Sequence, residues 1–336
     1  MKNLLLCCMA IALFAVCVFA QDAKTIFEQG SAQFSAKQYD ASIRSYRQYL
    51  TQVPTESAAY YNIGLCHFNM KRYEDSISAF KDAVRIKAAY TDAHRWLGSS
   101  YYELGRYEEA VAAYKEAIRQ KPDYVYALIF LGNSLDYLKR YNEAIAAYMK
   151  ALEYDPKNAG VYYEIGVAHY TQKNYTAAAD AYQRSIALDP KYTSALNNLG
   201  LCYEKLDRKT EAVAMYQAAI RSDKDYEHAH SNLATLLNNL KRYDEAEAAY
   251  RELIRLRPDS HESHVELGYI NSRKNRSSEA IAEFNTAIRI KPDYAWARLG
   301  LGGPQETSST KNRRPLIRPS ARRFRAFLTS DLATAT

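Results

Sequence analysis

The chain has 336 residues and a formal net charge of +7. Most of this charge lies in residues 303–336, which contain seven basic and two acidic residues, so the remainder is nearly neutral and does not indicate a specific nucleic-acid-binding protein. The sequence contains no glycine-rich phosphate loop, nucleophile elbow or paired Cys and His, and it therefore supports neither an enzyme nor a bound cofactor.

Residues 1–20 have the composition of a secretory signal peptide. Lys2 precedes an apolar run over residues 4–20, and we expect cleavage before Gln21. The alternative is an uncleaved membrane anchor, although an apolar run of this length is at the short end of what spans a bilayer. Both alternatives predict an exported protein, periplasmic or secreted, and only an uncleaved segment would anchor it in the membrane.

A 34-residue unit, represented by residues 91–124, predicts a helical hairpin. Apolar and small residues in each half recur every three or four positions, as they do on one face of a helix. Gly105 separates the halves, and glycine readily adopts the left-handed conformation of a turn between helices. Pro122 ends the second helix because it lacks an N–H and its ring clashes with the preceding turn.

The unit recurs without an insertion. Repeats begin at Ala23, Ser57, Thr91, Val125, Ala159, Thr193, Glu227 and His261, and an incomplete ninth begins at Ala295. The eighth position is small, namely Gly30, Gly64, Gly98, Gly132, Gly166, Gly200, Ala234 and Gly268. The twentieth is Ser or Ala, and the twenty-fourth is aromatic, namely Tyr46, Phe80, Tyr114, Tyr148, Tyr182, Tyr216, Tyr250 and Phe284. We expect the small residues to let two helices approach closely and the ring to fill the remaining space.

This pattern resembles the tetratricopeptide repeat, a 34-residue helix–turn–helix with small residues at the eighth and twentieth positions. The resemblance covers about residues 23–294. It implies an all-α fold, a right-handed α-solenoid of eight hairpins within residues 21–302. One hairpin cannot bury its apolar face alone, so neighbouring hairpins must stack.

The resemblance also implies a concave groove in which extended peptides or partner helices dock on the first helix of each repeat. Positions two, five, nine and twelve of that helix form one stripe, which position six flanks. Carried over to this chain, the N-terminal half of the groove contains Phe27, Phe34, Tyr61, Phe68, Tyr102, Tyr126, Tyr163 and Tyr170. The C-terminal half contains Asn197, Asn198, Asn232 and Asn238, with Glu204 and His228. The sequence leaves open an alternative, in which the rings fill gaps between adjacent first helices.

Some members of the family hold a carboxylate terminus in a Lys/Asn/Arg clamp. Arg95, Ser99 and Phe130 do not reproduce the spacing of that clamp, so we do not expect it here.

Two cysteines, Cys66 and Cys202, lie outside residues 1–20 and occupy the same position in the second and sixth repeats. Four stacked hairpins would hold them tens of ångströms apart, which excludes a disulfide. We expect both to be small buried side chains. His230 and His264 lie one repeat apart, but no set of converging ligands is evident, and no metal site is predicted.

The 34-residue register ends near residue 302. Residues 303–336 form either a disordered basic arm that contacts anionic lipid, polysaccharide or nucleic acid, or an unrelated sequence appended by a change of reading frame. The second alternative would leave the apolar face of the last repeat uncovered, so that self-association through this repeat becomes possible.

These observations predict a non-enzymatic interaction scaffold, in the cell envelope or outside the cell, that binds a protein or peptide ligand. The competing hypothesis is an accessory or targeting subunit for a separate enzyme, such as a glycosyltransferase, or for a secretion or assembly machine.

Overall fold

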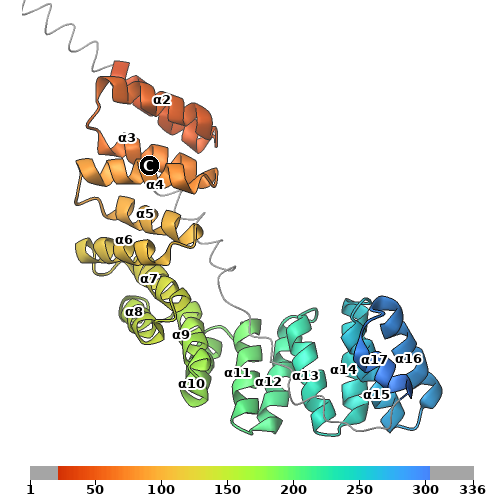
Figure 1. The fold of residues 1–336 in the computed structure, drawn as a ribbon. Helices are drawn as coiled ribbons and strands as arrows, with labels where there is room; N and C mark the ends of the chain where they lie inside the picture. The colour runs from red at the N-terminus through yellow and green to blue at the C-terminus, as the bar shows by residue number, and fades with distance from the viewer. Residues whose placement is uncertain (1–21, 303–336) are drawn as a thin grey trace, which may run out of the picture. The chain divides into compact units, whose positions relative to one another are not determined.

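The computed structural model describes residues 22–302, so the predicted signal segment and the basic tail lie outside the described part of the chain. Every regular element over residues 22–302 is helical, and successive helices pack as pairs (Figure 1). This confirms the predicted all-α fold of repeated hairpins. The chain divides into two compact units, Met1–Pro156 and Lys157–Thr336.

The described part of the first unit contains four hairpins. A helix over residues 22–35 pairs with α2. The helices that follow are α2 (Tyr39–Gln52), α3 (Ser57–Asn69), α4 (Tyr73–Ile86), α5 (Thr91–Glu103), α6 (Tyr107–Gln120), α7 (Val125–Tyr137) and α8 (Tyr141–Tyr154). The hairpins pack in chain order, and each helix contacts mainly its neighbours in the sequence.

The second unit repeats this arrangement with four hairpins and a short last helix. Its helices are α9 (Ala159–Thr171), α10 (Tyr175–Leu188), α11 (Thr193–Lys205), α12 (Lys209–Ser222), α13 (Glu227–Asn239), α14 (Tyr243–Leu256), α15 (His261–Arg273), α16 (Ser277–Ile290) and α17 (Ala295–Gly302). No helix within residues 22–302 is both long enough and apolar enough to cross a bilayer.

The close approach expected at the eighth position is present in both units. A Cβ atom added to Gly132 would lie 2.4 Å from the ring of Tyr148, which is closer than a real Cβ contact allows. The same pairing occurs for Gly30 with Tyr46, Gly64 with Phe80, Gly98 with Tyr114, Gly166 with Tyr182, Gly200 with Tyr216 and Gly268 with Phe284. The aromatic ring at the twenty-fourth position is at most 3 % exposed in all eight repeats. It is therefore the centre of each hairpin's core.

The turns within the hairpins all contain one residue with positive φ. Gly105 adopts φ +73°, as its position predicts. The other turns use Lys37, Lys71, Lys139, Lys173, Asp207, Lys241 and Asn275, with φ between 57° and 63°. A non-glycine residue in this region costs roughly 1–2 kcal/mol. Backbone hydrogen bonds offset this cost; for example, the N–H of Arg72 donates to the carbonyl of His67 at 2.9 Å.

Cys66 and Cys202 are both free and fully buried, as expected. The thiol of Cys66 donates to Ser42 Oγ at 3.4 Å. Burial raises the pKa of Cys66 to about 11 and that of Cys202 to about 12, so both thiols are neutral at pH 7.

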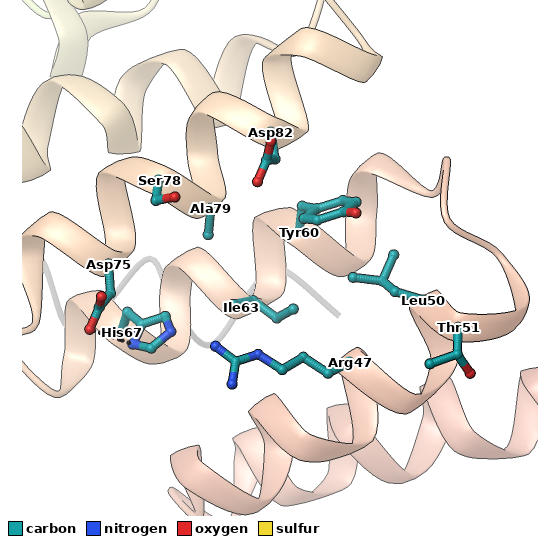
Figure 2. Close-up of a pocket in the computed structure, with 10 residues that line it drawn as sticks. All are labelled: Arg47, Leu50, Thr51, Tyr60, Ile63, His67, Asp75, Ser78, Ala79 and Asp82. Carbon is teal, nitrogen blue, oxygen red and sulfur yellow. Dashed lines mark ion pairs between the residues drawn. The ribbon is translucent and has the colours of Figure 1, made fainter.

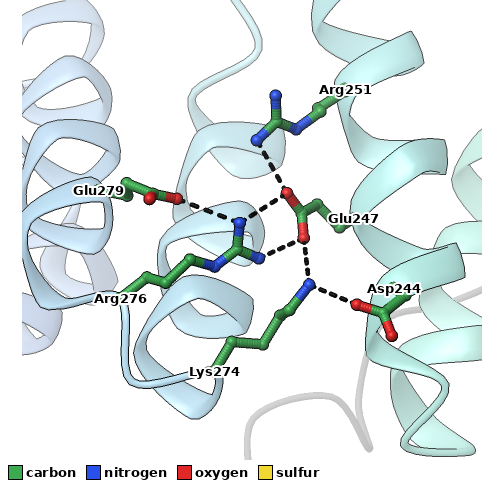
Figure 3. A network of polar contacts seen from close by, with 6 residues as sticks. All are labelled: Asp244, Glu247, Arg251, Lys274, Arg276 and Glu279. Carbon is green, nitrogen blue, oxygen red and sulfur yellow. Dashed lines mark hydrogen bonds and ion pairs between the residues drawn. The ribbon is translucent and has the colours of Figure 1, made fainter.

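An ion-pair network joins the seventh and eighth repeats in the second unit (Figure 3). Glu247 of α14 is 8 % exposed and accepts hydrogen bonds from Arg251 at 2.8 Å and from Lys274 at 2.8 Å. Arg276 donates to both of its carboxylate oxygens. These cations, Arg276 first, lower the pKa of Glu247 to about 2.

Candidate partner-binding site

The predicted groove residues are less exposed than a fully open groove would require. Eight are at most 9 % exposed, namely Tyr61, Phe68, Tyr163, Tyr170, Asn197, Asn198, Asn232 and Asn238. The other four, Phe27, Phe34, Tyr102 and Tyr126, are half-buried. None of the twelve is an exposed side chain, and whether they bind a partner stays a prediction.

The buried rings pack against the neighbouring helices. Tyr61 stacks on Tyr90 with the ring centroids 5.0 Å apart, and Phe68 meets the edge of Trp96 at 4.8 Å. In the second unit, Tyr163 stacks on Tyr192 at 5.0 Å. Gap filling between helices, the alternative that the sequence left open, therefore describes Tyr61, Phe68 and Tyr163 better than an open groove does.

Beside the stripe in the first unit lies an aromatic cluster, formed by Tyr102 of the stripe with Tyr107 of α6 and Tyr137 of α7. Tyr137, at the end of α7, is 40 % exposed. It stacks on Tyr107 with an interplanar angle of 3° and a centroid distance of 4.5 Å. Tyr102 meets both rings edge-on, at 5.5 Å from Tyr107 and 5.8 Å from Tyr137. This cluster offers an aromatic surface to a ligand.

Arg95 of α5 occupies position five of the stripe and is 5 % exposed. Its Cζ atom lies 3.9 Å from the ring centroid of Trp96 and 4.8 Å from that of Tyr126. Its Nε and Nη1 atoms are buried without a hydrogen-bond partner among residues 22–302. Arg95 is not among the predicted groove residues, although the sequence contains a signal for it, because neighbouring repeats have Tyr61 and Ile129 at this position.

Asp136 of α7 occupies position twelve of the stripe and is half-buried. Its Oδ1 atom is buried and lacks a hydrogen-bond partner within the described range. Burial raises the pKa of Asp136 to about 6. The two preceding repeats have Phe68 and Tyr102 here, so a carboxylate again replaces a ring.

The predicted amide-rich half of the stripe is a hydrogen-bonded chain inside the second unit. Asn232 donates to Asn197 at 2.9 Å, and Asn197 donates to Asn198 at 3.2 Å. Asn198 then donates to the hydroxyls of Tyr163 at 3.3 Å and Tyr182 at 3.4 Å. Each of these amides is hydrogen-bonded to another side chain of the second unit, so the amides stabilise the interior of that unit.

The remaining polar residues of this half are also engaged. Asn238 donates to Glu266 at 3.3 Å, and the hydroxyl of Tyr216 donates to Glu204. Burial raises the pKa of the Glu204 carboxyl above its ordinary value. Helical spacing assigns Asn238 and Glu204 to one stripe but does not show which residues they contact.

The histidines do not converge on a shared site. His230 Nε2 lies 2.8 Å from the carbonyl oxygen of Lys224, whereas His264 Nδ1 lies 2.6 Å from Glu283 Oε2. Within residues 22–302 there is no group of three or more His, Cys, Asp or Glu side chains arranged to hold a metal ion.

Comparison with known families identifies the class of protein that this fold defines. A model of the tetratricopeptide repeat matches residues 27–91, 131–193 and 231–295. A second model, described as a TPR repeat, matches residues 98–136, and a third, again the tetratricopeptide repeat, matches residues 181–214. The chain belongs to the tetratricopeptide repeat family, whose members generally act as protein–protein interaction scaffolds. No curated protein matches the sequence.

Solved structures share the fold at low sequence identity. The C-terminal part of a TPR repeat-containing protein from Cytophaga hutchinsonii is 16 % identical, with a TM-score of 0.54, over 82 % of this chain and 99 % of that one. The pilF protein of Pseudomonas aeruginosa is 21 % identical, with a TM-score of 0.51, over 62 % of this chain and 95 % of that one. YrrB, a TPR protein with an unusual peptide-binding site, is 23 % identical, with a TM-score of 0.49, over 56 % and 97 %. At these identities the likeness extends to the fold alone.

Proposed function

We propose that this chain is a non-enzymatic scaffold that binds an extended peptide segment of a partner protein on the first-helix stripe of its first unit. The segment would lie along α5 and α7, next to the aromatic cluster of Tyr102, Tyr107 and Tyr137. Tyrosine suits such a surface because it combines an apolar face and a hydroxyl with little conformational freedom to lose.

One observation supports this proposal above the others. The stripe contains two buried donor atoms, Nε and Nη1 of Arg95, and a buried acceptor atom, Asp136 Oδ1, none of which has a hydrogen-bond partner within residues 22–302. A buried polar group without a partner costs about 1–3 kcal/mol, and more when it is charged. An extended peptide supplies carbonyl oxygens and N–H groups in alternation, so one backbone can satisfy both residues.

The test begins with a random peptide library displayed against the full chain. We expect a selected peptide to lose affinity about tenfold or more with Arg95→Gln and with Asp136→Asn, since hydrogen bonds to charged groups contribute about 1.5–3 kcal/mol. Titration calorimetry measures the affinities. Arg119→Gln, an exposed arginine paired with Glu116 outside the stripe, is the matched control and should bind as the wild type does. Equal affinities in all four proteins would exclude the stripe as the binding surface.

Two further parts of the proposal concern location and assembly. Export rests on the signal-like composition of residues 1–20, and detection of the protein in the cytosol alone would contradict it. An accessory role for a separate enzyme or secretion machine is the alternative function, which purification from the envelope or secreted fraction with one stoichiometric enzyme would favour.

We also propose self-association through the last repeat. On α17, Trp296, Leu299 and Leu301 are each more than 40 % exposed, and Ile281 of α16 is 50 % exposed. Exposed apolar groups of this size favour contact with another apolar surface. Sedimentation of the full chain over a range of concentrations measures this, and a monomer throughout would contradict it.

A further inference from the structure

A cavity of about 380 Å³ opens between α2 and α4 in the first unit (Figure 2), and none of the residues that line it belongs to the stripe. Arg47 and Leu50 of α2 line one side, and Asp75 and Asp82 of α4 line the other. Tyr60, Ile63 and His67 of α3 lie between them. The volume falls within the range typical of small-molecule sites.

His67, at the eleventh position of the second repeat, is one of the residues that line this cavity. Tyr101 and Tyr203 occupy the eleventh position in the third and sixth repeats, and each ring makes a cation–π contact. The Cζ atom of Arg106 lies 4.7 Å from the Tyr101 ring centroid, and that of Arg208 lies 4.2 Å from the Tyr203 ring centroid. The second repeat has the smaller His67 instead. A tyrosine at this position would be larger than His67 and would occupy part of the cavity.

The side chains around the cavity have unused bonding capacity. His67 is 6 % exposed, and its Nδ1 atom is buried without a hydrogen-bond partner in the described structure. Arg47 has no hydrogen bond or ion pair within residues 22–302. Its counterpart one repeat later, Lys81, lies over the Tyr101 ring at 5.8 Å, a contact that His67 does not offer.

Charges of opposite sign face the cavity without meeting. Arg47 is on the α2 side, whereas Asp75 and Asp82 are on the α4 side, and no ion pair joins Arg47 to either carboxylate in the described part of the chain. Asp82 is paired with Arg85 at 2.8 Å, and Asp75 lies 3.7 Å from His67 Nδ1. Asp75 is thus the carboxylate more available to a ligand.

A ligand that satisfies both sides must carry a negative and a positive charge. A simple anion would be repelled by the carboxylates of α4, and a simple cation would leave Arg47 unpaired. The cavity sets a third requirement for its ligand, because Leu50, Tyr60 and Ile63 line it with apolar surface. The ligand therefore needs an apolar part beside its two charges.

We propose that this cavity binds a zwitterionic small molecule with an apolar side chain, namely a free α-amino acid. Arg47 pairs with the carboxylate, Asp75 accepts hydrogen bonds from the ammonium group, and His67 Nδ1 gains a polar partner at the inner end. Leu50, Tyr60 and Ile63 contact the side chain. This site goes beyond the proposed scaffold function, because none of these contacts involves Arg95, Asp136 or the aromatic cluster.

The experiment uses L-leucine as the probe and titration calorimetry on the full chain. We expect leucine to bind, whereas 4-methylpentanoate, which lacks the ammonium group, and 3-methylbutylamine, which lacks the carboxylate, bind at least tenfold more weakly. If either analogue binds as tightly as leucine, or if leucine shows no binding at millimolar concentration, the zwitterion assignment is wrong.

Two variants locate the site. His67→Tyr copies the residue of the third repeat, fills the cavity and should abolish leucine binding, with the helical circular dichroism of the wild type as the check on folding. Arg47→Ala, on an exposed side chain, should weaken binding at least tenfold. Lys81→Ala, the same position one repeat later, is the control and should bind leucine as the wild type does. Unchanged binding in Arg47→Ala would overturn the proposal even if His67→Tyr failed to fold.

Discussion

At the residue scale, the hydroxyl of each buried tyrosine determines its polar neighbour. In the first unit, the ring at the twenty-fourth position bonds to position nine: Tyr46 to Ser31 at 3.0 Å, Tyr114 to Ser99 at 3.1 Å and Tyr148 to Asn133 at 2.8 Å. The second repeat has Phe80 instead, and its position nine is Leu65. In the first unit, position nine is thus polar where a buried hydroxyl needs a partner and apolar where it does not. In the second unit, the hydroxyls of Tyr182 and Tyr216 bond instead to Asn198 and Glu204.

This pairing gives a prediction for the fourth repeat. Tyr148→Phe should destabilise the protein by about 1–2 kcal/mol, because the Oδ1 atom of buried Asn133 loses the hydroxyl that donates to it. Adding Asn133→Leu, which copies the Leu65–Phe80 pair of the second repeat, should recover most of that loss. Tyr148→Ala should cost more, about 3–5 kcal/mol, because it removes the whole ring.

Urea unfolding of the three variants measures these differences. If the double variant is no more stable than Tyr148→Phe, the hydroxyl does not explain the choice of residue at position nine.

At the element scale, the hairpins could be predicted and most of their turns could not. Small residues and an aromatic residue recur at fixed spacing because they form a close contact between two helices, such as that between Gly132 and Tyr148. Their pattern therefore predicts the helix pairs. A left-handed turn is evident from sequence at Gly105 alone. Lys139 takes the same conformation without any local preference for it, because the two flanking helices determine the backbone there.

The site was predicted less well, for a related reason. Helical spacing assigns Tyr61 and Tyr163 to one stripe of the first helices. It does not say how much of that stripe the next hairpin covers, and the contact of Phe68 with Trp96 is a contact between repeats. The sequence did contain a signal for the site, namely the charged residues Arg95 and Asp136. In the first unit, their positions in the repeat are otherwise apolar or aromatic.

The ion-pair network between α14 and the turn that joins α15 to α16 replaces an apolar contact. Position 21 is Glu247 in the seventh repeat but Val213 in the sixth, and position 14 of the following repeat is Lys274 instead of Leu240. Val213 and Leu240 belong to one apolar cluster. At Glu247 and Lys274, hydrogen bonds between charged groups thus replace apolar packing. The local stability therefore depends on pH.

The sign of that dependence follows from the lowered pKa of Glu247, about 2 against an ordinary 4.5. A carboxyl with a lower pKa in the folded state stabilises the fold above pH 4.5 and loses this contribution as the pH falls toward 2. Glu247→Gln should cost about 1–3 kcal/mol at pH 7, and the difference from the wild type should shrink at pH 3. Urea midpoints at the two pH values measure it.

The apolar counterpart provides the control. Glu247→Val combined with Lys274→Leu copies the sixth repeat and should restore stability at pH 7, because replacing a buried ion pair by packed apolar groups is often neutral. If the double variant remains as unstable as Glu247→Gln, the network contributes more than the apolar contact does.

At the scale of the whole molecule, stability is a sum of local terms. Within each unit, each helix contacts mainly the helices before and after it, as α4 contacts α3 and α5. In such a chain a defect weakens its own repeat and the interfaces beside it. A compact globule, in contrast, would lose stability everywhere at once.

Hydrogen exchange on the full chain tests this difference through one ring in each unit. Phe80 of α4 and Phe284 of α16 are at most 2 % exposed, so Phe80→Ala and Phe284→Ala should each cost about 3–5 kcal/mol. We expect Phe80→Ala to speed amide exchange in α3, α4 and α5 while α15 and α16 exchange as in the wild type, and Phe284→Ala to do the reverse. Met149→Ala, on a side chain that is 53 % exposed, should change neither region. If Phe80→Ala speeds exchange equally in both units, the hairpins unfold as one cooperative body and the additive description is wrong.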